Sequence, residues 1–228
     1  KVLGESPGFD SANTLTAAIS LPESKYPDDS ARVQSFARIL EAVRNRPGVE
    51  SAALGSNVPF DDRMGGASYR IDGRSVSGTP PHGHALSVDG NYFKALGIPL
   101  LRGRTFNRDD WDNASKVVVI DELFEHKQFP AGDAIGSRLD MGRPSEPDFY
   151  TIVGVVGTAK YEDLAAGDFE ETYYFNFAES SDASAMLTLR TSLPPSAMVE
   201  PLRSAISAVD ADLPVFELQT MQERISLS

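Results

Sequence analysis

The chain has no cysteine and only three histidines among its 228 residues. Disulfides and thiolate metal sites are therefore excluded. A chain without thiols suits an oxidising compartment, although a cytosolic protein needs none either. No apolar run approaches the roughly 20 residues that span a bilayer, and we find no signal peptide. The sequence begins at Lys1 and ends at Ser228 in the middle of a pattern, so we expect a piece of a longer protein.

Basic residues are also in deficit. Lys and Arg number 21 against 33 Asp and Glu, which gives a formal net charge of -12. A field of this sign repels phosphate groups, so a nucleic-acid partner and an anionic membrane surface are both disfavoured. The densest basic run, residues 102–108, is followed directly by Asp109 and Asp110. A hydrophobic content of 41% with 24% charged residues is typical of a folded globular protein.

The N-terminal part of the sequence predicts a strand, a helix and a second strand. Polar and apolar residues alternate over residues 15–21, and a proline ends this strand. Asp28 offers a helix N-cap, and residues 33–43 place an apolar side chain at every third or fourth position. Pro47-Gly48 stops the helix, and residues 49–56 predict the second strand.

The C-terminal part repeats this unit, with predicted strands at residues 185–191 and 215–218. Four apolar residues share one face of the helix predicted between them: Val199, Leu202, Ile206 and Val209. Pro201 lies early in this helix, which therefore starts late or is kinked. Two such units with a long insertion between them predict an α+β fold with a split βαβ, ferredoxin-like layer of helices on a sheet.

The middle of the sequence differs in its predicted secondary structure, with short strands separated by turns rich in glycine and proline. The predicted strands are residues 68–71, 85–88, 117–120, 137–141, 150–156 and 173–177, and the predicted helices are residues 91–96 and 121–128. We therefore expect a mostly-β subdomain, residues 60–179. It is inserted into an α/β subdomain made of residues 1–59 and 180–228.

Two clusters of possible metal ligands are weak. His82-Gly83-His84 could present two imidazoles, but His126 is distant in sequence and no cysteine completes a ligand set. Asp109-Asp110 and Asp112 lack the alternating ligands, the central glycine and the distant glutamate of a calcium loop. We predict polar turn residues in the first case and an acidic surface loop in the second.

Nucleotide-binding and nucleophile motifs are weak too. Gly154 and Gly157 fall in or at the end of one predicted strand, whereas a dinucleotide fingerprint lies between a strand and a helix. Gly55-Ser56-Asn57 lacks the flanking glycines of a nucleophile elbow. The carboxylate pairs Asp61-Asp62 and Glu170-Glu171 are predicted to lie in solvated turns. The sequence thus predicts no catalytic residue, no cofactor and no metal.

The segment that looks most specific carries no reactive group. Residues 91–106 predict a short helix anchored by Tyr92 and Phe93, a stop at Gly97, and an apolar turn before Arg102-Gly103-Arg104. Segments of this kind recur along the whole chain: GFD at 8–10, SLP at 20–22, KYP at 25–27, RPGVESAA at 46–53, NYFKALGIPLLRGR at 91–104, VVVIDE at 117–122, FP at 129–130, DAIG at 133–136, IVGVVG at 152–157 and LPVF at 213–216.

In this order the segments resemble the periplasmic core domain of MacB-like, FtsX-type permeases of ABC transporters. The resemblance is strongest to the duplicated orphan permeases that are abundant in acidobacteria. Those permeases commonly carry asparagine at the position of Asp121, and a helix rich in arginine and alanine at residues 123–128. We expect both differences to lie on the surface.

The resemblance implies a domain inserted between the first and second transmembrane helices of a permease, on the periplasmic side of the inner membrane. Residues 1–59 and 180–228 would form a porter-like subdomain, and residues 60–179 a mostly-β "Sabre" subdomain. Such a domain performs no catalysis and relays conformational change that ATP drives on the cytoplasmic side. Implied partners are the flanking transmembrane helices, a second permease copy, a separate ATPase subunit, and substrate or a periplasmic protein.

A relay of this kind needs rigid lobes and hinges, for which residues 59–62 and 179–184 are the candidates. Four apolar residues could form an exposed partner patch, although we expect them to pack inside the second lobe: Phe93, Ile98, Leu100 and Leu101.

A competing hypothesis is a domain that senses or binds a small molecule or lipoprotein between its lobes, which an apolar cleft lined by aromatic residues would favour. A soluble hydrolase would need a convergent nucleophile and base, or a pocket with paired carboxylates.

Overall fold

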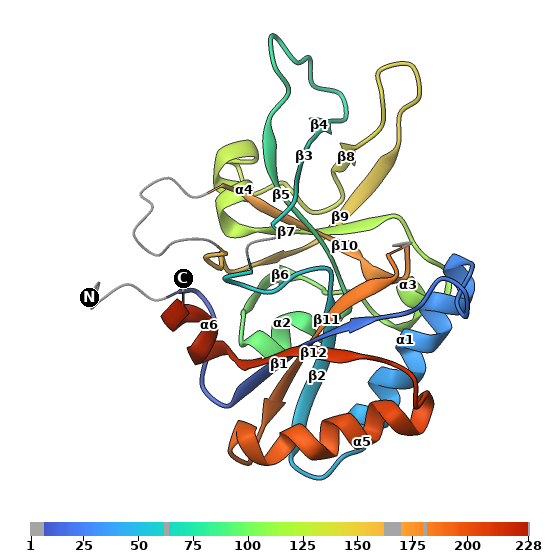
Figure 1. Cartoon of the computed structure of the whole chain (residues 1–228). Helices are drawn as coiled ribbons and strands as arrows, with labels where there is room; N and C mark the ends of the chain where they lie inside the picture. Colours follow the sequence, from blue (N-terminus) through green and yellow to red (C-terminus); the bar gives the residue numbers. More distant parts are fainter. Residues whose placement is uncertain (1–6, 62–63, 162–169, 180–181, 228) are drawn as a thin grey trace.

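The computed structural model describes residues 7–61, 64–161, 170–179 and 182–227. One mixed sheet of 12 strands forms the α+β fold, in the order β12-β1-β11-β2-β5-β10-β7-β9-β8-β4, with β3 paired to β5 and β6 paired to β9 (Figure 1). The strands are β1 (Thr14–Ser20), β2 (Val49–Gly55), β3 (Gly66–Ser68), β4 (Arg70–Ile71), β5 (His82–Val88), β6 (Leu100–Gly103), β7 (Val117–Asp121), β8 (Arg138–Asp140), β9 (Phe149–Val156), β10 (Thr172–Asn176), β11 (Ser184–Thr191) and β12 (Val215–Thr220). The helices are α1 (Asp29–Arg44), α2 (Tyr92–Leu96), α3 (Arg108–Asp112), α4 (Glu122–Gln128), α5 (Val199–Val209) and α6 (Met221–Leu227), with 3-10 turns η1 (Phe177–Glu179) and η2 (Pro195–Met198).

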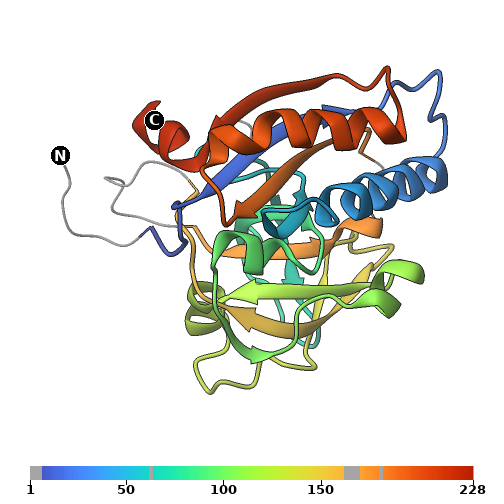
Figure 2. The ribbon, with the colours of Figure 1, turned by 90° about the horizontal axis from the view of Figure 1, so that it is seen from below.

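Strands from the two ends of the chain make one side of this sheet, which we call the terminal part together with α1, α5 and α6. β1 pairs antiparallel with β12 and β11, and β11 pairs antiparallel with β2, so β1 and β2 run in the same direction with β11 between them. α1 and α5 lie side by side over one face of these strands (Figure 2). Both predicted strand–helix–strand units are confirmed as elements.

Local sequence explains where the two long helices begin. The Asp28 carboxylate accepts a hydrogen bond from the Ala31 N–H at 2.8 Å and caps α1. α5 begins at Val199, so Pro201 lies in its first turn, where the missing N–H leaves no hydrogen bond unmade. The late start is therefore the correct alternative for this helix. Apolar side chains of α1 and α5 bury against the terminal strands in one cluster: Phe36, Ile39, Leu40, Val43, Leu202 and Ile206.

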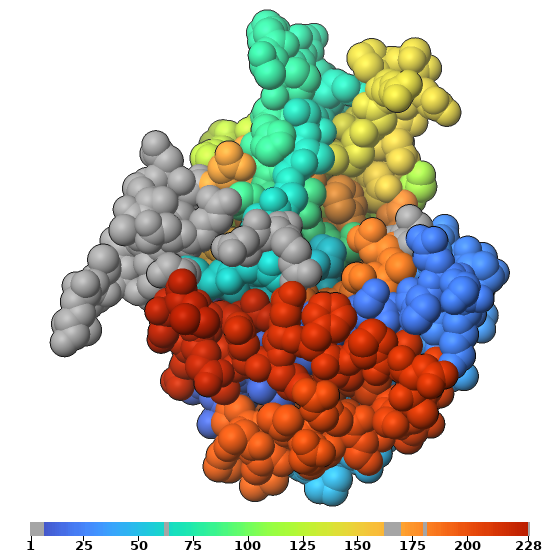
Figure 3. Space-filling model, in the orientation of Figure 1, coloured from blue at the N-terminus to red at the C-terminus, as the bar shows by residue number. Residues whose placement is uncertain are grey.

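The other strands, with α2, α3 and α4, form what we call the central part. β10 runs parallel to β5 and antiparallel to β7, and β7 runs parallel to β9. The strand predicted at residues 68–71 is two strands, because Tyr69 turns inward between them and packs on Phe124 and Tyr173. The loops between β4 and β5 and between β8 and β9 project as two separate tips (Figure 3).

The structure corrects the prediction for residues 98–101. Gly97, at φ 69°, ends α2 as expected, but Leu100–Gly103 is strand β6 rather than a turn. Ile98 is buried at 4% exposure, whereas Leu100 and Leu101 are 46% and 43% exposed. β6 borders only β9 among the described strands, so it lies at an edge of the sheet. The expectation of internal packing is therefore right for Phe93 and Ile98 and wrong for the two leucines.

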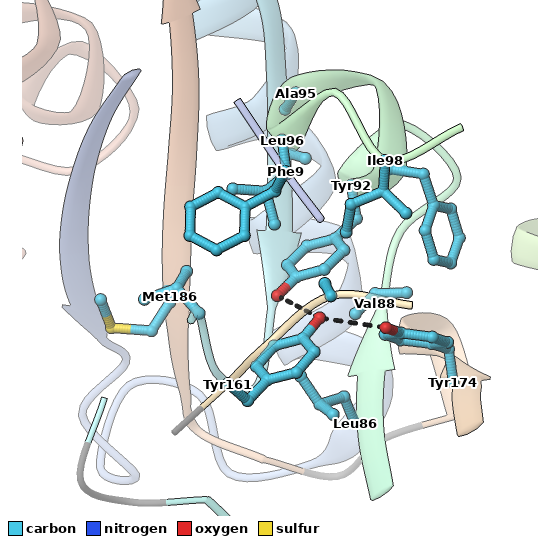
Figure 4. Packing of buried hydrophobic residues seen from close by; sticks show 14 of the residues in the cluster. Phe9, Leu86, Val88, Tyr92, Ala95, Leu96, Ile98, Tyr161, Tyr174 and Met186 are labelled. Atoms are coloured by element: carbon cyan, nitrogen blue, oxygen red, sulfur yellow. Dashed lines mark hydrogen bonds between the residues drawn. The ribbon is translucent and has the colours of Figure 1, made fainter. Parts of the chain in front are cut away.

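A shared hydrophobic core joins the terminal and central parts. The sheet itself is narrow there, because Gly55 and Val88 are the only described pair between β2 and β5. Around that pair, one cluster takes side chains from both parts (Figure 4): Phe9, Ala53, Met186 and Met221 from the terminal part, and Leu86, Val88, Tyr92, Phe93, Leu96 and Tyr174 from the central part. A large apolar interface opposes relative movement of the parts it joins. Of the two proposed hinge segments, residues 62, 180 and 181 lie outside the described residues.

Three tyrosines cross this core in a hydrogen-bonded chain (Figure 4). The Tyr161 hydroxyl lies 3.3 Å from that of Tyr92 and donates to that of Tyr174 at 3.2 Å. The Tyr92 hydroxyl also donates to the Asn57 carbonyl at 3.0 Å. Burial raises the pKa of all three phenols well above the usual range, so the three hydroxyl groups stay neutral. These bonds satisfy polar groups that the core would otherwise bury without partners.

Gly103 gives a direct test of how tightly β6 is held. Its φ is 68°, and a Cβ at this position would lie 2.2 Å from the Val153 carbonyl oxygen of β9. We expect Gly103→Ala to lower the free energy of unfolding by about 2–4 kcal/mol, from left-handed backbone strain plus a steric clash. Gly73→Ala is the matched control, because φ is 76° there but no atom lies within 4 Å. It should cost only about 1 kcal/mol in urea denaturation, and equal losses in both variants would contradict the close approach.

Candidate functional site

The structure brings the first proposed metal cluster only partly together. His82 and His84 lie on strand β5, which corrects the prediction of turn residues. Their Nδ1 atoms are 3.6 and 4.0 Å from one carboxylate oxygen of Glu170. His126 lies elsewhere, on α4, where it faces Glu122 at 3.9 Å. Across the described ranges, no group of three or more histidine or acidic side chains is arranged to hold a metal ion.

The acidic residues 109–112 form a helix, which corrects the prediction of a loop. Asn107 and Asp110 make a reciprocal capping box, with both backbone-to-side-chain bonds at 2.9 Å. Arg104 holds the buried Asp110 carboxylate with two hydrogen bonds of 2.5 and 3.1 Å. These carboxylates stabilise α3. Residues 107–110 contain the capping signal, but the sequence was compared only with a calcium loop and an acidic surface loop.

One member of each carboxylate pair is buried, which corrects the prediction of solvated turns for Asp61 and Glu171, whereas Glu170 is exposed as predicted. Asp61 is 8% exposed, and its carboxylate lies 4.0 Å from the guanidinium of Arg224 on α6. Glu171 is 5% exposed and accepts hydrogen bonds from Tyr69 at 2.8 Å and Lys127 at 2.6 Å. Each of these two acids pairs with residues that are far away in sequence. The sequence around each acid does not reveal such partners. Asp62 lies outside the described residues.

The remaining motifs have structural explanations. Gly154 lies within β9, where a Cβ would meet the Arg104 carbonyl oxygen at 2.1 Å, so a close backbone approach accounts for it. The Ser56 hydroxyl accepts a hydrogen bond from the Ser87 N–H at 3.0 Å beside the junction of the two parts. Neither position brings a nucleophile, a base or a phosphate cradle together.

Asp121 is completely buried, whereas the sequence interpretation placed it on the surface. It is 0% exposed and caps α4, accepting a hydrogen bond from the Phe124 N–H at 2.7 Å. Burial raises the pKa of its carboxyl to about 7. Residues 123–128 are not wholly on the surface either, because Phe124 and Glu125 are buried and Glu125 pairs with Arg102 of β6.

A hollow lies where the terminal and central parts meet, and we call it the junction groove. Its volume is about 630 Å³, within the range of small-molecule sites. Three segments line it: Ala37, Arg38, Leu40, Glu41, Arg44 and Asn45 of α1 and its end, residues 89–91 after β5, and Phe106, Asn107, Arg108 and Trp111 around α3. No local motif connects these segments, so they could not be recognised as a set from the sequence.

An ion pair between the partly exposed Arg44 and the buried Asp89 forms the base of the junction groove. The Arg44 guanidinium at the end of α1 donates to the Asp89 carboxylate at 2.6 Å and to the Ala52 carbonyl at 3.0 Å. Asp89 also accepts from the Asn91 N–H at 2.8 Å. Burial raises the pKa of the Asp89 carboxyl to about 6, although the Arg44 charge acts in the opposite direction. This pair ties α1 of the terminal part to the turn before α2 of the central part.

The opposite wall of the junction groove is fixed by aromatic packing. Trp111 of α3 stacks on Phe177, with ring centroids 6.1 Å apart and an interplanar angle of 11°. Phe177 in turn meets Phe36 of α1 edge to face at 5.3 Å. Because the capping box and the Arg104–Asp110 pair also hold α3, both walls are preformed.

Comparison with known proteins agrees with this architecture. The family model of the MacB-like periplasmic core domain matches residues 7–209. The fold is similar to that of the periplasmic region of MacB from Actinobacillus actinomycetemcomitans, with a TM-score of 0.60 and 14% identity over 99% of this chain and 98% of that one. It is also similar to the extracellular domain of the noncanonic ABC-type transporter YknZ from Gram-positive bacteria, with a TM-score of 0.55 and 12% identity over 89% of this chain and 100% of that one.

No curated protein sequence matches the chain closely enough to add to these findings. Among the described residues, no helix is both long and apolar enough to cross a membrane. The family match spans most of the chain and the two structural likenesses support the same fold. The chain therefore belongs to the MacB-like periplasmic core domain family, the extracytoplasmic domains of ABC transporter permeases.

Proposed function

We propose that this chain is a non-catalytic relay, which transmits conformational change between the membrane helices of its permease and a substrate or partner in the periplasm. The observation that supports the proposal is the shared core, because a core built from both parts favours their movement as one body. A body of this kind transmits force because packed cores resist continuous deformation. Partners and substrate are expected at exposed surfaces such as the two projecting tips.

The strand order supports a porter-like assignment for the terminal part. Numbered within that part alone, the order β12-β1-β11-β2 reads 4-1-3-2, and each crossover helix, α1 and α5, packs on the same face. This is the split βαβ arrangement. We assign the central part as the Sabre-like subdomain, with boundaries at residues 60 and 179. Limited proteolysis tests these boundaries, since cuts should concentrate near them.

Both described ends of the chain are anchored at the junction, which suits a relay to flanking membrane helices. The Lys160 N–H donates to the Pro7 carbonyl at 2.9 Å, and Phe9 shares the common core with Met221 of α6. Arg224 of α6 is 7% exposed and donates to the Thr16 hydroxyl at 2.7 Å. A displacement of α6 therefore reaches the sheet directly.

Replacing Arg224 with methionine in the full-length permease tests this relay. We expect substrate transport to fall at least about tenfold while ATP hydrolysis by the partner ATPase continues, because α6 loses its polar anchors to Thr16 and Asp61. Transport and hydrolysis are measured on the same vesicles, and thermal unfolding of the isolated domain shows whether the variant is folded. Arg203→Met on α5, which is exposed, is the control. Unchanged transport by a folded Arg224→Met variant would contradict the relay.

Placement and assembly are tested separately. A cysteine introduced at Ser75, in a projecting tip, should react with a membrane-impermeant maleimide in intact spheroplasts, and the unmodified permease is the background control. Reaction only after lysis would place the domain on the cytoplasmic side of the membrane, contrary to the proposal.

We further propose that the parent is a duplicated orphan permease that pairs with a second permease copy and a separate ATPase subunit. The parent gene should then encode two similar halves and no nucleotide-binding domain.

A second candidate function, ligand binding, is favoured by the junction groove. Its lining is not the apolar, mainly aromatic one that would favour this hypothesis, but mixes polar and apolar side chains. Because it lies between the two parts, a bound molecule would contact both of them. The groove therefore gives the ligand-binding alternative a definite place in the molecule.

A further inference from the structure

We propose that the junction groove binds a small amphiphilic carboxylate, with the carboxylate on the α1 side and the apolar body against Leu40, Phe106 and Trp111. This inference goes beyond the relay function and does not depend on it. The groove has the three properties that such a ligand needs: local positive charge, uncommitted hydrogen-bond donors, and an apolar wall. Each property comes from a different set of lining residues.

The charge of the lining is opposite to that of the whole protein. Over the whole chain, acidic residues outnumber basic residues 33 to 21. In the groove the order is reversed, because three arginines, Arg38, Arg44 and Arg108, face two acids, Glu41 and Asp89. Asp89 is engaged by Arg44. Arg108 is held by Asp112 and, more weakly, by the charge of Glu41, which together raise the pKa of its guanidinium. Arg38 is thus the cation that remains available.

Three lining side chains have donors without an internal partner. Within the described ranges, the side chains of Arg38, Asn45 and Asn91 take part in no hydrogen bond or ion pair. Arg38 lies on α1 and Asn45 is its C-cap residue, so the spacing of seven residues places them on the same side of the helix. Asn91 projects from the opposite segment, after β5. A guanidinium and two carboxamides around one hollow can satisfy a carboxylate, which accepts several hydrogen bonds and prefers charged donors.

The apolar wall fits a short hydrocarbon or aromatic body. Leu40 and Phe106 are buried at 3% and 6% exposure, and Trp111 is half-buried above Phe177. A volume of about 630 Å³ accommodates a molecule of this size. A purely inorganic anion would leave this wall unused, and a neutral hydrocarbon would leave the donors unused. The combination therefore selects an amphiphilic acid over both.

The single tryptophan makes this proposal directly measurable, because Trp111 lines the groove and the chain contains no other tryptophan. Titration with octanoate should change tryptophan emission in a saturable manner, and octanoate should raise the unfolding temperature by mass action. Arg38→Gln should weaken octanoate binding at least about tenfold, which corresponds to about 1.4 kcal/mol. Arg203→Gln, the same charge change at an exposed site on α5 outside the groove, should leave the affinity unchanged.

Two further probes separate the recognised groups. Acetate has the carboxylate alone and should bind at least tenfold more weakly than octanoate, while octylammonium, with the same chain and opposite charge, should give no saturable signal. Equal binding of octylammonium, or octanoate binding that Arg38→Gln leaves intact, would overturn the proposal. So would the absence of any saturable change. None of these outcomes affects the Arg224 test of the relay, so the two proposals fail independently.

Discussion

Replacing Phe93 with alanine is expected to lower the free energy of unfolding by about 3–5 kcal/mol and to destabilise the terminal and central parts together. Phe93 is 2% exposed and meets the rings of Tyr92 and Tyr174 edge to face, at 5.9 and 4.9 Å. It comes from α2 of the central part, and α2 packs against β2 and β11 of the terminal part. Its removal leaves a cavity in the core that both parts share.

The measurement is urea denaturation followed by two signals, tryptophan fluorescence and far-ultraviolet circular dichroism. Trp111 reports on the wall of the junction groove, whereas circular dichroism averages over the whole sheet and all helices. Coincident curves before and after the substitution are expected for one cooperative unit. Leu101→Ala is the control, because Leu101 is 43% exposed and should cost no more than about 0.5 kcal/mol. Two separated transitions in either protein would contradict the single rigid body on which the relay proposal depends.

A single cooperative unit also changes how motion would pass through the domain. The sequence suggested hinges at residues 59–62 and 179–184, within the chain crossings between the two parts. In the structure, Asp61 beside the first crossing is buried against Arg224, and the cluster around Phe93 fills the interface. Movement of the whole domain relative to the membrane helices then needs less local unfolding than movement of one part against the other.

Periodic patterns predicted the regular elements well, because burial on one face leaves a regular trace in the sequence. The apolar positions of residues 33–43 mark the buried face of α1. The alternation at residues 15–21 corresponds to β1, although both faces of that strand are buried. The predictions failed where partners came from far away. The separate strands β3 and β4 depend on an inward turn of Tyr69 toward Phe124, and β6 depends on pairing with β9. Such contacts leave no period in the local sequence.

Buried charged residues show even more clearly that local sequence does not predict contacts with residues far away in the chain. Asp61, Asp121 and Glu171 are polar in sequence and were predicted to be solvated, yet each is less than 10% exposed. Their environments are set by Arg224, the first turn of α4, and Lys127 with Tyr69. The junction groove is the extreme case, since its lining comes from three separate segments and no part of it forms a motif. For this chain the ordered set of short segments indicated the family, and the three-dimensional structure was needed to find the groove.

Asp121→Asn is expected to stabilise the domain at neutral and alkaline pH, and the stabilisation should grow as the pH rises from about 4 to about 7. The reason is a proton balance. Burial raises the pKa of the Asp121 carboxyl to about 7, whereas the pKa of an aspartate in an unfolded chain is about 3.9. Between these values the folded protein binds the extra proton, so stability falls as the pH rises. Three pKa units correspond to an upper limit of about 4 kcal/mol.

Asparagine keeps the structural role of this residue while removing its titration. Its side-chain oxygen can accept the same hydrogen bond from the Phe124 N–H, since asparagine and aspartate are equally good N-caps. Asp89 titrates in the same direction, with a pKa of about 6, but it is present in both proteins and cancels in the difference between them.

The check is a series of thermal or urea unfolding curves for both proteins between pH 4 and pH 8. Asp28→Asn is the matched control, because Asp28 makes the same capping hydrogen bond at the start of α1 but is exposed to solvent. Its effect should stay within about 1 kcal/mol at every pH. A difference between wild type and Asp121→Asn that is constant over this range would mean that Asp121 is charged throughout. In that case the cap of α4 would have to compensate the burial of a full charge. The contact between α4 and β7 would then be a polar site in its own right, rather than part of an apolar core that tolerates one carboxyl group.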